Sequence, residues 1–299
     1  MTVPDEPGPH GATVAGATDH ASAPGERDWG AFEVTVAFGG TTALDDVTLP
    51  AVRGQVAAVV GGDGAGKTTL LRTLIGRIRP QSGRVSAPPT PYCGFMPTGA
   101  SGVWTDLTVT ENIAFVAAAH HLGGGELVRR REELLQAAGL ERAADRLAGN
   151  LSGGMRQKLA FCLAILHKPR LLVLDEPSTG VDPVSRVDLW RLISRTAAEG
   201  ASVVMATTYL DEAERASTCL VLDRGRVLAG GAPADVLAHV PGTVTSGDAP
   251  AGPRELSWRR GRRTRSWHPG PARPGEQPVT PDMEDAVIAF TLADQHREH

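Results

Sequence analysis

The chain has 299 residues, of which 41% are hydrophobic and 21% charged, and its formal net charge is -4 at pH 7. This length allows one large domain or two modest ones, and the negative charge argues against nucleic acid as a partner of the whole surface. No apolar run approaches the ~20 residues of a membrane span, and the N-terminus lacks the profile of a secretion signal. Together these features favour a cytoplasmic protein that reaches a membrane only through a partner.

Three cysteines, Cys93, Cys162 and Cys219, lie far apart in the chain. Their spacing does not match a metal site, and Cys162 lies within an apolar run. We therefore expect reduced cysteines in the core of a cytoplasmic protein.

Changes in composition divide the chain into three parts. Residues 1–29 are rich in Gly, Ala and Pro without periodicity, which predicts a disordered lead. Residues 30–240 alternate apolar strands with helical spacing and are predicted to form the main domain, with a helical lobe at about residues 100–166. Residues 241–299 are predicted to be a C-terminal extension with a linker and a short terminal helix.

The main domain begins with alternating apolar residues that predict two or three strands, and the last of them, residues 56–60, is continuously apolar. Helical spacing follows residue 66. Residues 109–166 are also predicted to be helical, with a capping box at Thr108 and Glu111 and an interruption at Gly123–Gly125.

Further apolar strands are predicted at residues 171–174 and 202–206, with a helix near 184–198 between them and a closing hairpin at 219–228. Strands that alternate with helices predict an α/β fold with a mostly parallel sheet. The helical block between two strands is best explained as a separate lobe.

The C-terminal extension looks loop-like over residues 241–280, and Pro281 then opens a short amphipathic helix with Met283, Val287 and Phe290 near one face. The loop-like stretch carries a cluster of arginines: Arg254, Arg259, Arg260, Arg262, Arg263 and Arg265. A solvated loop or a small regulatory appendage is the favoured interpretation. Contact with anionic lipid headgroups or with nucleic acid are the alternatives.

A glycine-rich segment joins the apolar strand at 56–60 to the helix after it, and this context predicts a P-loop. Its backbone N–H groups would point at phosphate oxygens, Lys67 would reach the β- and γ-phosphates, and the Thr68 hydroxyl would bind Mg²⁺. The predicted cofactors are therefore ATP and Mg²⁺. The residues expected to hold the nucleotide here are Gly61, Gly62, Asp63, Gly64, Ala65, Gly66, Lys67, Thr68 and Thr69.

Two adjacent carboxylates, Asp175 and Glu176, follow the apolar strand at 171–174. This places Asp175 at the edge of the sheet that also carries the P-loop, where a ligand of Mg²⁺ or of its water is needed. Glu176 can orient and partly deprotonate an attacking water. We therefore predict Glu176, Lys67 and Asp175 as the catalytic residues, with Thr68 and Asp175 at the metal.

The run Leu151-Ser152-Gly153-Gly154-Met155-Arg156-Gln157 resembles the signature of ATP-binding-cassette (ABC) ATPases. The resemblance implies a P-loop NTPase fold with a RecA-like core, an antiparallel β subdomain and an inserted helical lobe. It also implies that Ser152, Gly153 and Gly154 contact the γ-phosphate of ATP held by another cassette. Asp182 resembles the residue that crosses the dimer interface. Phe38 lies where the family stacks a ring on adenine, although it could equally be a core residue.

The resemblance covers roughly residues 30–240 and is closest to cassettes that serve multidrug and other exporter-type permeases. This likeness is carried by residues 151–182 and 209–214 and by the tail at 281–286. It implies an integral-membrane permease and a second cassette, identical or different, as partners, at the inner face of the cell membrane. Trp104 and Leu107 would contact the permease if they are exposed and belong to the core if they are buried.

Two positions depart from the family pattern: Thr98 replaces a glutamine (the Q-loop) and Thr208 replaces a histidine (the H-loop). Threonine lacks an amide group and cannot carry a positive charge. We expect ATP binding to survive and hydrolysis to be slow, although neutral drift and an active site that relies on Glu176 alone remain alternatives.

Two other functional classes stay open. One is a non-transport ABC protein acting on ribosomes or nucleic acid. The other is a degenerate regulatory cassette that binds ATP without chemistry.

Overall fold

The computed structural model describes residues 29–298, so all but the last residue of the predicted lead lie outside the described part. The strands are β1 (Trp29–Phe38), β2 (Thr41–Ala51), β3 (Val56–Val60), β4 (Ser82–Ser86), β5 (Cys93–Met96), β6 (Leu171–Asp175), β7 (Ser202–Ala206), β8 (Thr218–Asp223), β9 (Arg226–Gly231), β10 (Thr243–Gly247), β11 (Ser257–Arg260) and β12 (Arg263–His268). The helices are α1 (Lys67–Leu74), α2 (Val109–Ala119), α3 (Gly124–Ala138), α4 (Gly153–Ile165), α5 (Pro183–Ala198), α6 (Leu210–Ala213), α7 (Pro233–Ala238) and α8 (Met283–Glu298). Short 3-10 turns connect several of them.

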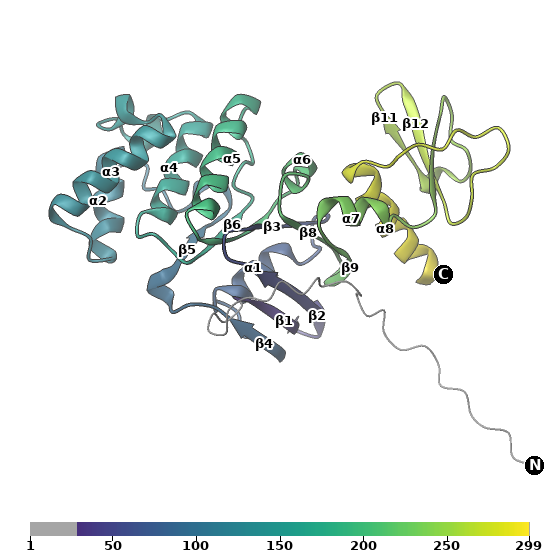
Figure 1. Cartoon of the computed structure of the whole chain (residues 1–299), viewed down its shortest axis with the longest axis horizontal. Helices are drawn as coiled ribbons and strands as arrows, with labels where there is room; N and C mark the ends of the chain where they lie inside the picture. Colours follow the sequence, from purple (N-terminus) through teal and green to yellow (C-terminus); the bar gives the residue numbers. More distant parts are fainter. Residues whose placement is uncertain (1–28, 299) are drawn as a thin grey trace, which may run out of the picture.

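A six-stranded sheet with the order β5-β6-β7-β3-β8-β9 forms the centre of the molecule (Figure 1). Its strands pair in parallel except for β9, which runs antiparallel to β8 as the predicted hairpin requires. Every residue of β3, β6 and β7 is buried. Continuous burial is typical of parallel strands that are covered on both faces, and the predicted mostly parallel sheet is confirmed.

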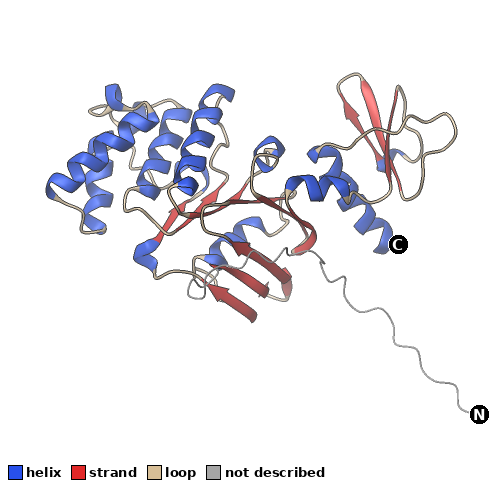
Figure 2. Cartoon of the chain, in the orientation of Figure 1, coloured by secondary structure: helices blue, strands red, loops and turns tan. Residues whose placement is uncertain are grey.

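Alternate residues of the central strands contribute to two apolar clusters on opposite faces of the sheet. One face packs with α1 and with the three-stranded antiparallel sheet β2-β1-β4, through residues such as Val59 and Val173. The other face packs with α2, α4 and α5, through residues such as Val60 and Leu174. Figure 2 shows the antiparallel strands on one side of the central sheet and the helical lobe toward the other.

The helical lobe begins where the sequence predicts it. Thr108 caps α2 by accepting a hydrogen bond from the Glu111 N–H at 3.1 Å, and the Glu111 carboxylate accepts from the Thr108 N–H at 2.8 Å. The Thr108 hydroxyl also donates to this carboxylate at 2.8 Å, and the hydrogen bonds from the Thr108 backbone and hydroxyl, the backbone one first, lower the pKa of Glu111. The predicted capping box is confirmed.

Removal of this cap gives a first test of the fold. Thr108→Ala is expected to lower the free energy of unfolding by about 1 kcal/mol, because the Glu111 N–H in the first turn of α2 loses the hydroxyl that accepts its hydrogen bond. Thermal unfolding of the variant beside Thr280→Ala, a change at an exposed loop position, measures the effect. Equal stability of the two variants would contradict it.

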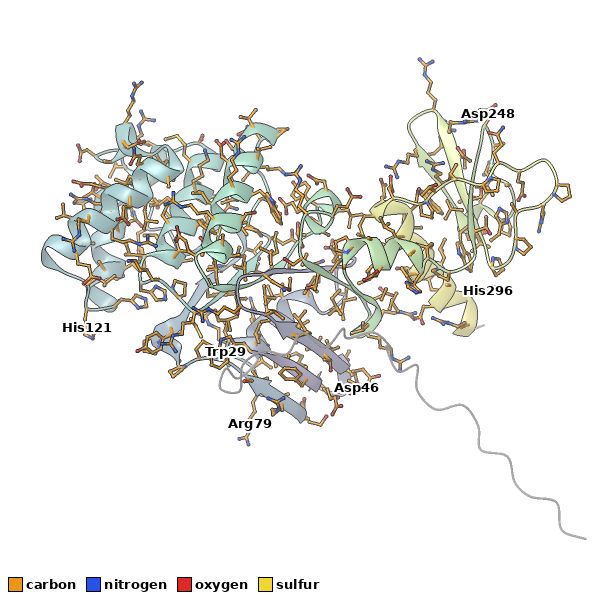
Figure 3. All side chains as sticks on the ribbon, in the orientation of Figure 1. Trp29, Asp46, Arg79, His121, Asp248 and His296 are labelled. Atoms are coloured by element: carbon orange, nitrogen blue, oxygen red, sulfur yellow. The ribbon has the colours of Figure 1, made fainter. Side chains whose placement is uncertain are left out.

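The C-terminal region contains a third sheet, with the order β10-β12-β11, so the prediction of a loop-like segment over 241–280 is wrong. One face of this sheet packs on α8 through Val244 and Trp267, which contact Ala289 and Ala293. Trp267 also meets the ring of His296 edge-on at 6.0 Å. Figure 3 shows His296 near the end of α8. The predicted terminal helix is present, but with 16 residues it is longer than the short helix that was predicted.

The arginine cluster is likewise only partly solvated. Arg260 pairs with Asp282, with Glu284 at 3.4 Å and with Asp285 at 3.5 Å, and the hydrogen bond to Asp282 raises the pKa of Arg260. Arg265 lies 3.7 Å from Asp285, whose side chain is 1% exposed. Arg260 and Arg265 therefore attach the first turn of α8 to the sheet. The other four arginines of the cluster are exposed: Arg254, Arg259, Arg262 and Arg263.

Cys162 and Cys219 are buried with free thiols, as expected of core residues, while Cys93 is partly buried. Burial raises the pKa of Cys162 and of Cys219 to about 12. Over residues 29–298, no helix combines the length and the apolar character that crossing a bilayer requires.

Candidate functional site

The glycine-rich loop between β3 and α1 contains two glycines that no larger residue could replace without a steric clash. Gly61 has a φ of 153°, and a Cβ atom there would lie 2.0 Å from the Leu222 carbonyl oxygen. Gly66 has a φ of 106°, and its Cβ would lie 2.6 Å from the Ala43 carbonyl oxygen. Gly62 and Gly64 face open space instead. The loop is thus packed on its inner side and open on the other.

Lys67 begins α1 and bends back over this loop. Its Nζ donates to the carbonyl oxygens of Gly61 at 2.8 Å and Gly62 at 3.1 Å, and the residue is only 7% exposed. The first turn of α1 contains no acidic residue, and Gly66 provides no side-chain cap. The N–H groups of that turn and the Lys67 ammonium therefore form a site for an anion.

The second half of the site comes from the end of β6. Asp175 is 2% exposed, and its Oδ1 accepts a hydrogen bond from the Thr68 hydroxyl at 3.1 Å. Thr69, the next residue of α1, is half-buried. A buried carboxylate and a hydroxyl on neighbouring elements supply the oxygen donors that suit Mg²⁺, so this donor set fits the predicted metal.

Glu176 follows directly and is held by three hydrogen bonds to one carboxylate oxygen. Its Oε2 accepts from the Thr208 N–H at 3.2 Å, the Thr208 hydroxyl at 3.1 Å and the Thr179 hydroxyl at 3.1 Å. Its Oε1 lies 3.9 Å from Lys67 Nζ. The backbone of Glu176 has a φ of 52°, and its N–H donates to the Ala206 carbonyl at 3.0 Å. A left-handed non-glycine residue of this kind is maintained only by such surrounding contacts.

Thr179 is a residue that sequence reasoning did not select. It lies three residues after Glu176, and its N–H donates to the Glu176 carbonyl at 3.3 Å, which closes a turn. Short turns that contain Ser or Thr commonly bring the hydroxyl back to a preceding polar group. That tendency is the signal that could have identified it.

The signature residues lie on a second surface, formed by the starts of α4 and α5. Ser152 caps α4 by accepting from the Met155 N–H at 3.2 Å, and Asp182 caps α5 by accepting from the N–H groups of Val184 at 3.1 Å and Ser185 at 3.0 Å. The pKa of Asp182 is lowered, and the largest cause is the hydrogen bond from the Ser185 backbone N–H.

The two helix starts are in close contact. A Cβ on Gly154 would lie 2.9 Å from the Ser185 side chain and 3.3 Å from Asp182 Oδ2, and a Cβ on Gly153 would lie 3.2 Å from the Gly180 carbonyl oxygen. The structure therefore brings the signature residues and Asp182 together. Within residues 29–298, no hydrogen bond or ion pair joins Ser152 or the two glycines to the P-loop.

The remaining predicted residues are on the surface. Phe38 is 53% exposed at the end of β1, which excludes the alternative that it is a core residue. Thr98 is exposed in a short 3-10 turn (Thr98–Ala100). Trp104 is 42% exposed and lies 4.3 Å from the ring of Phe115, itself 53% exposed, while Leu107 is half-buried. An exposed aromatic pair is typical of a surface that contacts a partner.

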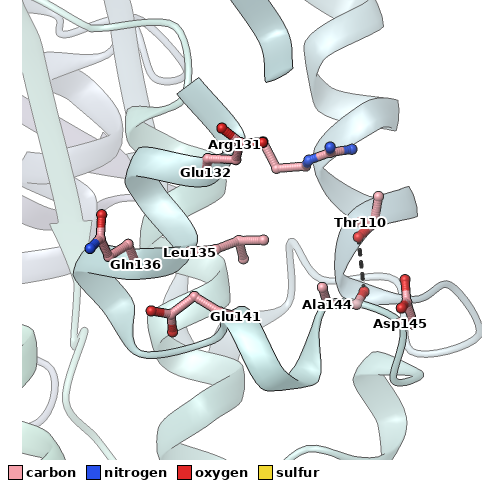
Figure 4. A pocket seen from close by; sticks show the side chains of 8 residues that line it. All are labelled: Thr110, Arg131, Glu132, Leu135, Gln136, Glu141, Ala144 and Asp145. Atoms are coloured by element: carbon pink, nitrogen blue, oxygen red, sulfur yellow. Dashed lines mark hydrogen bonds between the residues drawn. The ribbon is translucent and has the colours of Figure 1, made fainter. Parts of the chain in front are cut away.

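A cavity of about 520 Å³ lies in the helical lobe (Figure 4). It is lined by Thr110, Arg131, Glu132, Leu135, Gln136, Glu141, Ala144 and Asp145, none of which is a predicted site residue. The Thr110 hydroxyl donates to the Ala144 carbonyl at 3.0 Å and closes one side. This cavity shares no residue with the predicted nucleotide site.

Comparison with known proteins agrees with this geometry. Residues 44–179 match the family model described as ABC transporter. The probable multidrug ABC transporter ATP-binding protein YbhF of Escherichia coli is 39% identical over 198 residues, which are 63% of this chain and 34% of YbhF. The match to this relative thus spans about a third of its length.

Two further similarities cover more of the other protein. The daunorubicin resistance ATP-binding protein DrrA3 of Streptomyces coeruleorubidus is 34% identical over 69% of this chain and 68% of its own length. A solved ATP-binding subunit of an ABC transporter matches with a TM-score of 0.65 and 29% identity, over 71% of this chain and 92% of the other. The chain therefore belongs to the ATP-binding proteins of the ABC transporter family, ATPases with the P-loop NTPase fold.

Proposed function

We propose that the chain binds Mg-ATP at a head-to-tail interface with a second cassette and powers or regulates export through a membrane permease. The observation that carries this proposal is the cluster of Lys67, Thr68, Asp175 and Glu176 around the open P-loop. The names of the relatives, multidrug and daunorubicin resistance, support export. No feature of the described residues favours the alternative of a protein acting on ribosomes or nucleic acid.

In this proposal the loop residues 61–69 bind the phosphates, and Lys67 contributes the positive charge. Thr68 and Asp175 hold Mg²⁺, which would supply charge stabilisation to the phosphate oxygens when bound. The exposed ring of Phe38 stacks on the adenine base. Glu176 acts as the general base toward the attacking water.

The second cassette, identical or different, meets the surface of Ser152, Gly153, Gly154 and Asp182. Exposed backbone N–H groups at the start of α4 suit the γ-phosphate of the nucleotide that the other cassette holds. The permease would contact the exposed pair Trp104 and Phe115, with Leu107 beside it, at the inner face of the membrane. Residues 30–240 would act as the cassette and residues 241–299 as its appendage.

The proposal is tested by nucleotide-dependent assembly of the purified chain. Glu176→Gln removes the base while keeping the size of the side chain, so bound ATP persists. We expect this variant to bind Mg-ATP and to shift from monomer to dimer by light scattering with ATP and not with ADP. Adding Ser152→Arg should leave ATP binding intact and abolish the shift, because the new side chain fills the second anion site.

Two other outcomes would change or contradict this proposal. A chain that binds ATP but remains monomeric at every concentration requires a different cassette as its partner. Failure to bind ATP at all would contradict the proposed function.

A further inference from the structure

Glu176 has two chemically equal carboxylate oxygens that the structure places in different surroundings. Oε2 accepts all three hydrogen bonds from Thr179 and Thr208. Oε1 takes none of these bonds and lies 3.9 Å from the ammonium of Lys67, the residue that bends over the P-loop. The side chain of Glu176 is only 14% exposed, so its orientation depends on these neighbours.

We infer that Thr179 and Thr208 are positioning residues that anchor Oε2 of Glu176, so that Oε1 is the atom that accepts the proton of the attacking water. The inference deepens the proposed function and rests on it. It assigns a role to Thr179, and it gives Thr208 a role that does not need an imidazole.

The hydrolytic step then assigns each carboxylate oxygen one task. A water O–H bond breaks and its proton passes to Oε1, while the water oxygen forms a bond to the γ-phosphorus of ATP. The bond from that phosphorus to the bridging oxygen breaks, and its electron pair stays on ADP. The proton on Oε1 is later released to solvent. Oε2 keeps its three donors throughout and fixes the direction in which Oε1 points.

Two hydroxyls and one amide N–H share this anchoring, which determines how substitutions should behave. Thr208 donates from its backbone as well as its side chain, so loss of its hydroxyl leaves one of its two bonds in place. Thr179 is attached through a turn that forms independently of Thr208. Either threonine can therefore partly compensate for the other, and changing both leaves Oε2 with only the Thr208 N–H as a donor.

The experiment measures single-turnover hydrolysis of Mg-ATP by the full chain, with Glu176→Gln as the blank. Thr179→Val and Thr208→Val keep the side-chain shape and remove the hydroxyl. We expect a fall in rate of roughly 3- to 5-fold for each and ~10²-fold for the double variant, which is more than the product of the two single effects. The KM for ATP should change by less than about 2-fold, because the P-loop is untouched.

Conservative variants separate positioning from general structure. Thr179→Ser and Thr208→Ser keep the hydroxyls and should retain the rate of the unmodified chain, and Thr280→Val controls for changes at an exposed surface. In Thr208→His, the hydrolysis rate should change with pH around the pKa of imidazole, about 6.5. The rate of the unmodified chain should lack this step in its pH profile. Amide hydrogen exchange by NMR should be faster at Thr208 in Glu176→Ala, since its N–H loses its acceptor.

The outcomes separate the inference from the proposed function. A double valine variant with an unchanged rate, or serine variants as slow as the valine ones, would overturn the inference. So would the absence of any hydrolysis above the Glu176→Gln blank. ATP binding and ATP-dependent assembly, the tests of the proposed function, can succeed in each of these cases.

Discussion

Replacing Lys67 by alanine is expected to weaken ATP binding by roughly 10²- to 10³-fold, about 3 to 4 kcal/mol. The loss combines the buried positive charge that faces the phosphates with the two hydrogen bonds that Lys67 donates to the Gly61 and Gly62 carbonyls. Isothermal titration of the purified variant with ATP in the presence of Mg²⁺ measures the change.

The chain offers a matched control, since it contains only three lysines. Lys168 is exposed and does not belong to the P-loop. Lys168→Ala should bind ATP as the unmodified chain does. Similar affinity of the two alanine variants would show that the loop does not hold the phosphates.

The second large effect is expected at Asp285, the buried carboxylate of α8. Asp285→Ala should destabilise the attachment of α8 to the C-terminal sheet by about 3 kcal/mol, because Arg265 loses its only carboxylate partner among the described residues while remaining largely buried. Limited proteolysis should then cleave the region after residue 240, and the near-ultraviolet signal of Trp267 should fall.

Asp248→Ala is the control for this prediction, because Asp248 is exposed in the same region (Figure 3). It should leave the protease pattern unchanged. ATP affinity should be the same in both variants, since the P-loop belongs to a different part of the fold. Resistance of Asp285→Ala to protease would mean that the apolar contacts of Trp267 are sufficient for attachment.

The central part of the fold could be predicted from the sequence because its signals are local. The strand at 56–60 is apolar at every position, which only a strand covered on both faces tolerates, and the P-loop follows it directly. The same reasoning identified the strands predicted at 171–174 and 202–206. Each of these signals depends on a few adjacent residues and not on distant partners.

The C-terminal sheet could not be predicted because its strands lack apolar alternation. β12 reads Arg-Thr-Arg-Ser-Trp-His, and its buried residues are mostly polar. Thr245 contacts His268 Nε2 at 3.1 Å, and Arg265 forms an ion pair with a carboxylate that lies 20 positions later in the chain. The burial of such polar residues cannot be predicted from the sequence, because their partners lie far away in the chain and meet them only in the folded structure.

The residues of the candidate site could be predicted from their motifs, but the contacts between them could not. Lys67, Thr68, Asp175 and Glu176 were selected from their motifs, and the structure brings them together. Thr179 was not predicted as a site residue, because a threonine in a short turn is only a weak signal, and its contact with Glu176 also depends on the left-handed backbone at Glu176.

A chain of two hydrogen bonds connects α4 to the carboxylate of Glu176, the predicted base of the same chain. Gln157 Nε2, on α4, donates to the Thr179 carbonyl at 3.3 Å, and the Thr179 hydroxyl donates to Glu176 Oε2. In the proposed dimer, the start of α4 meets the nucleotide of the other cassette. Under the proposed function, we therefore expect ATP that the other cassette holds at the start of α4 to influence the orientation of Glu176 in this chain.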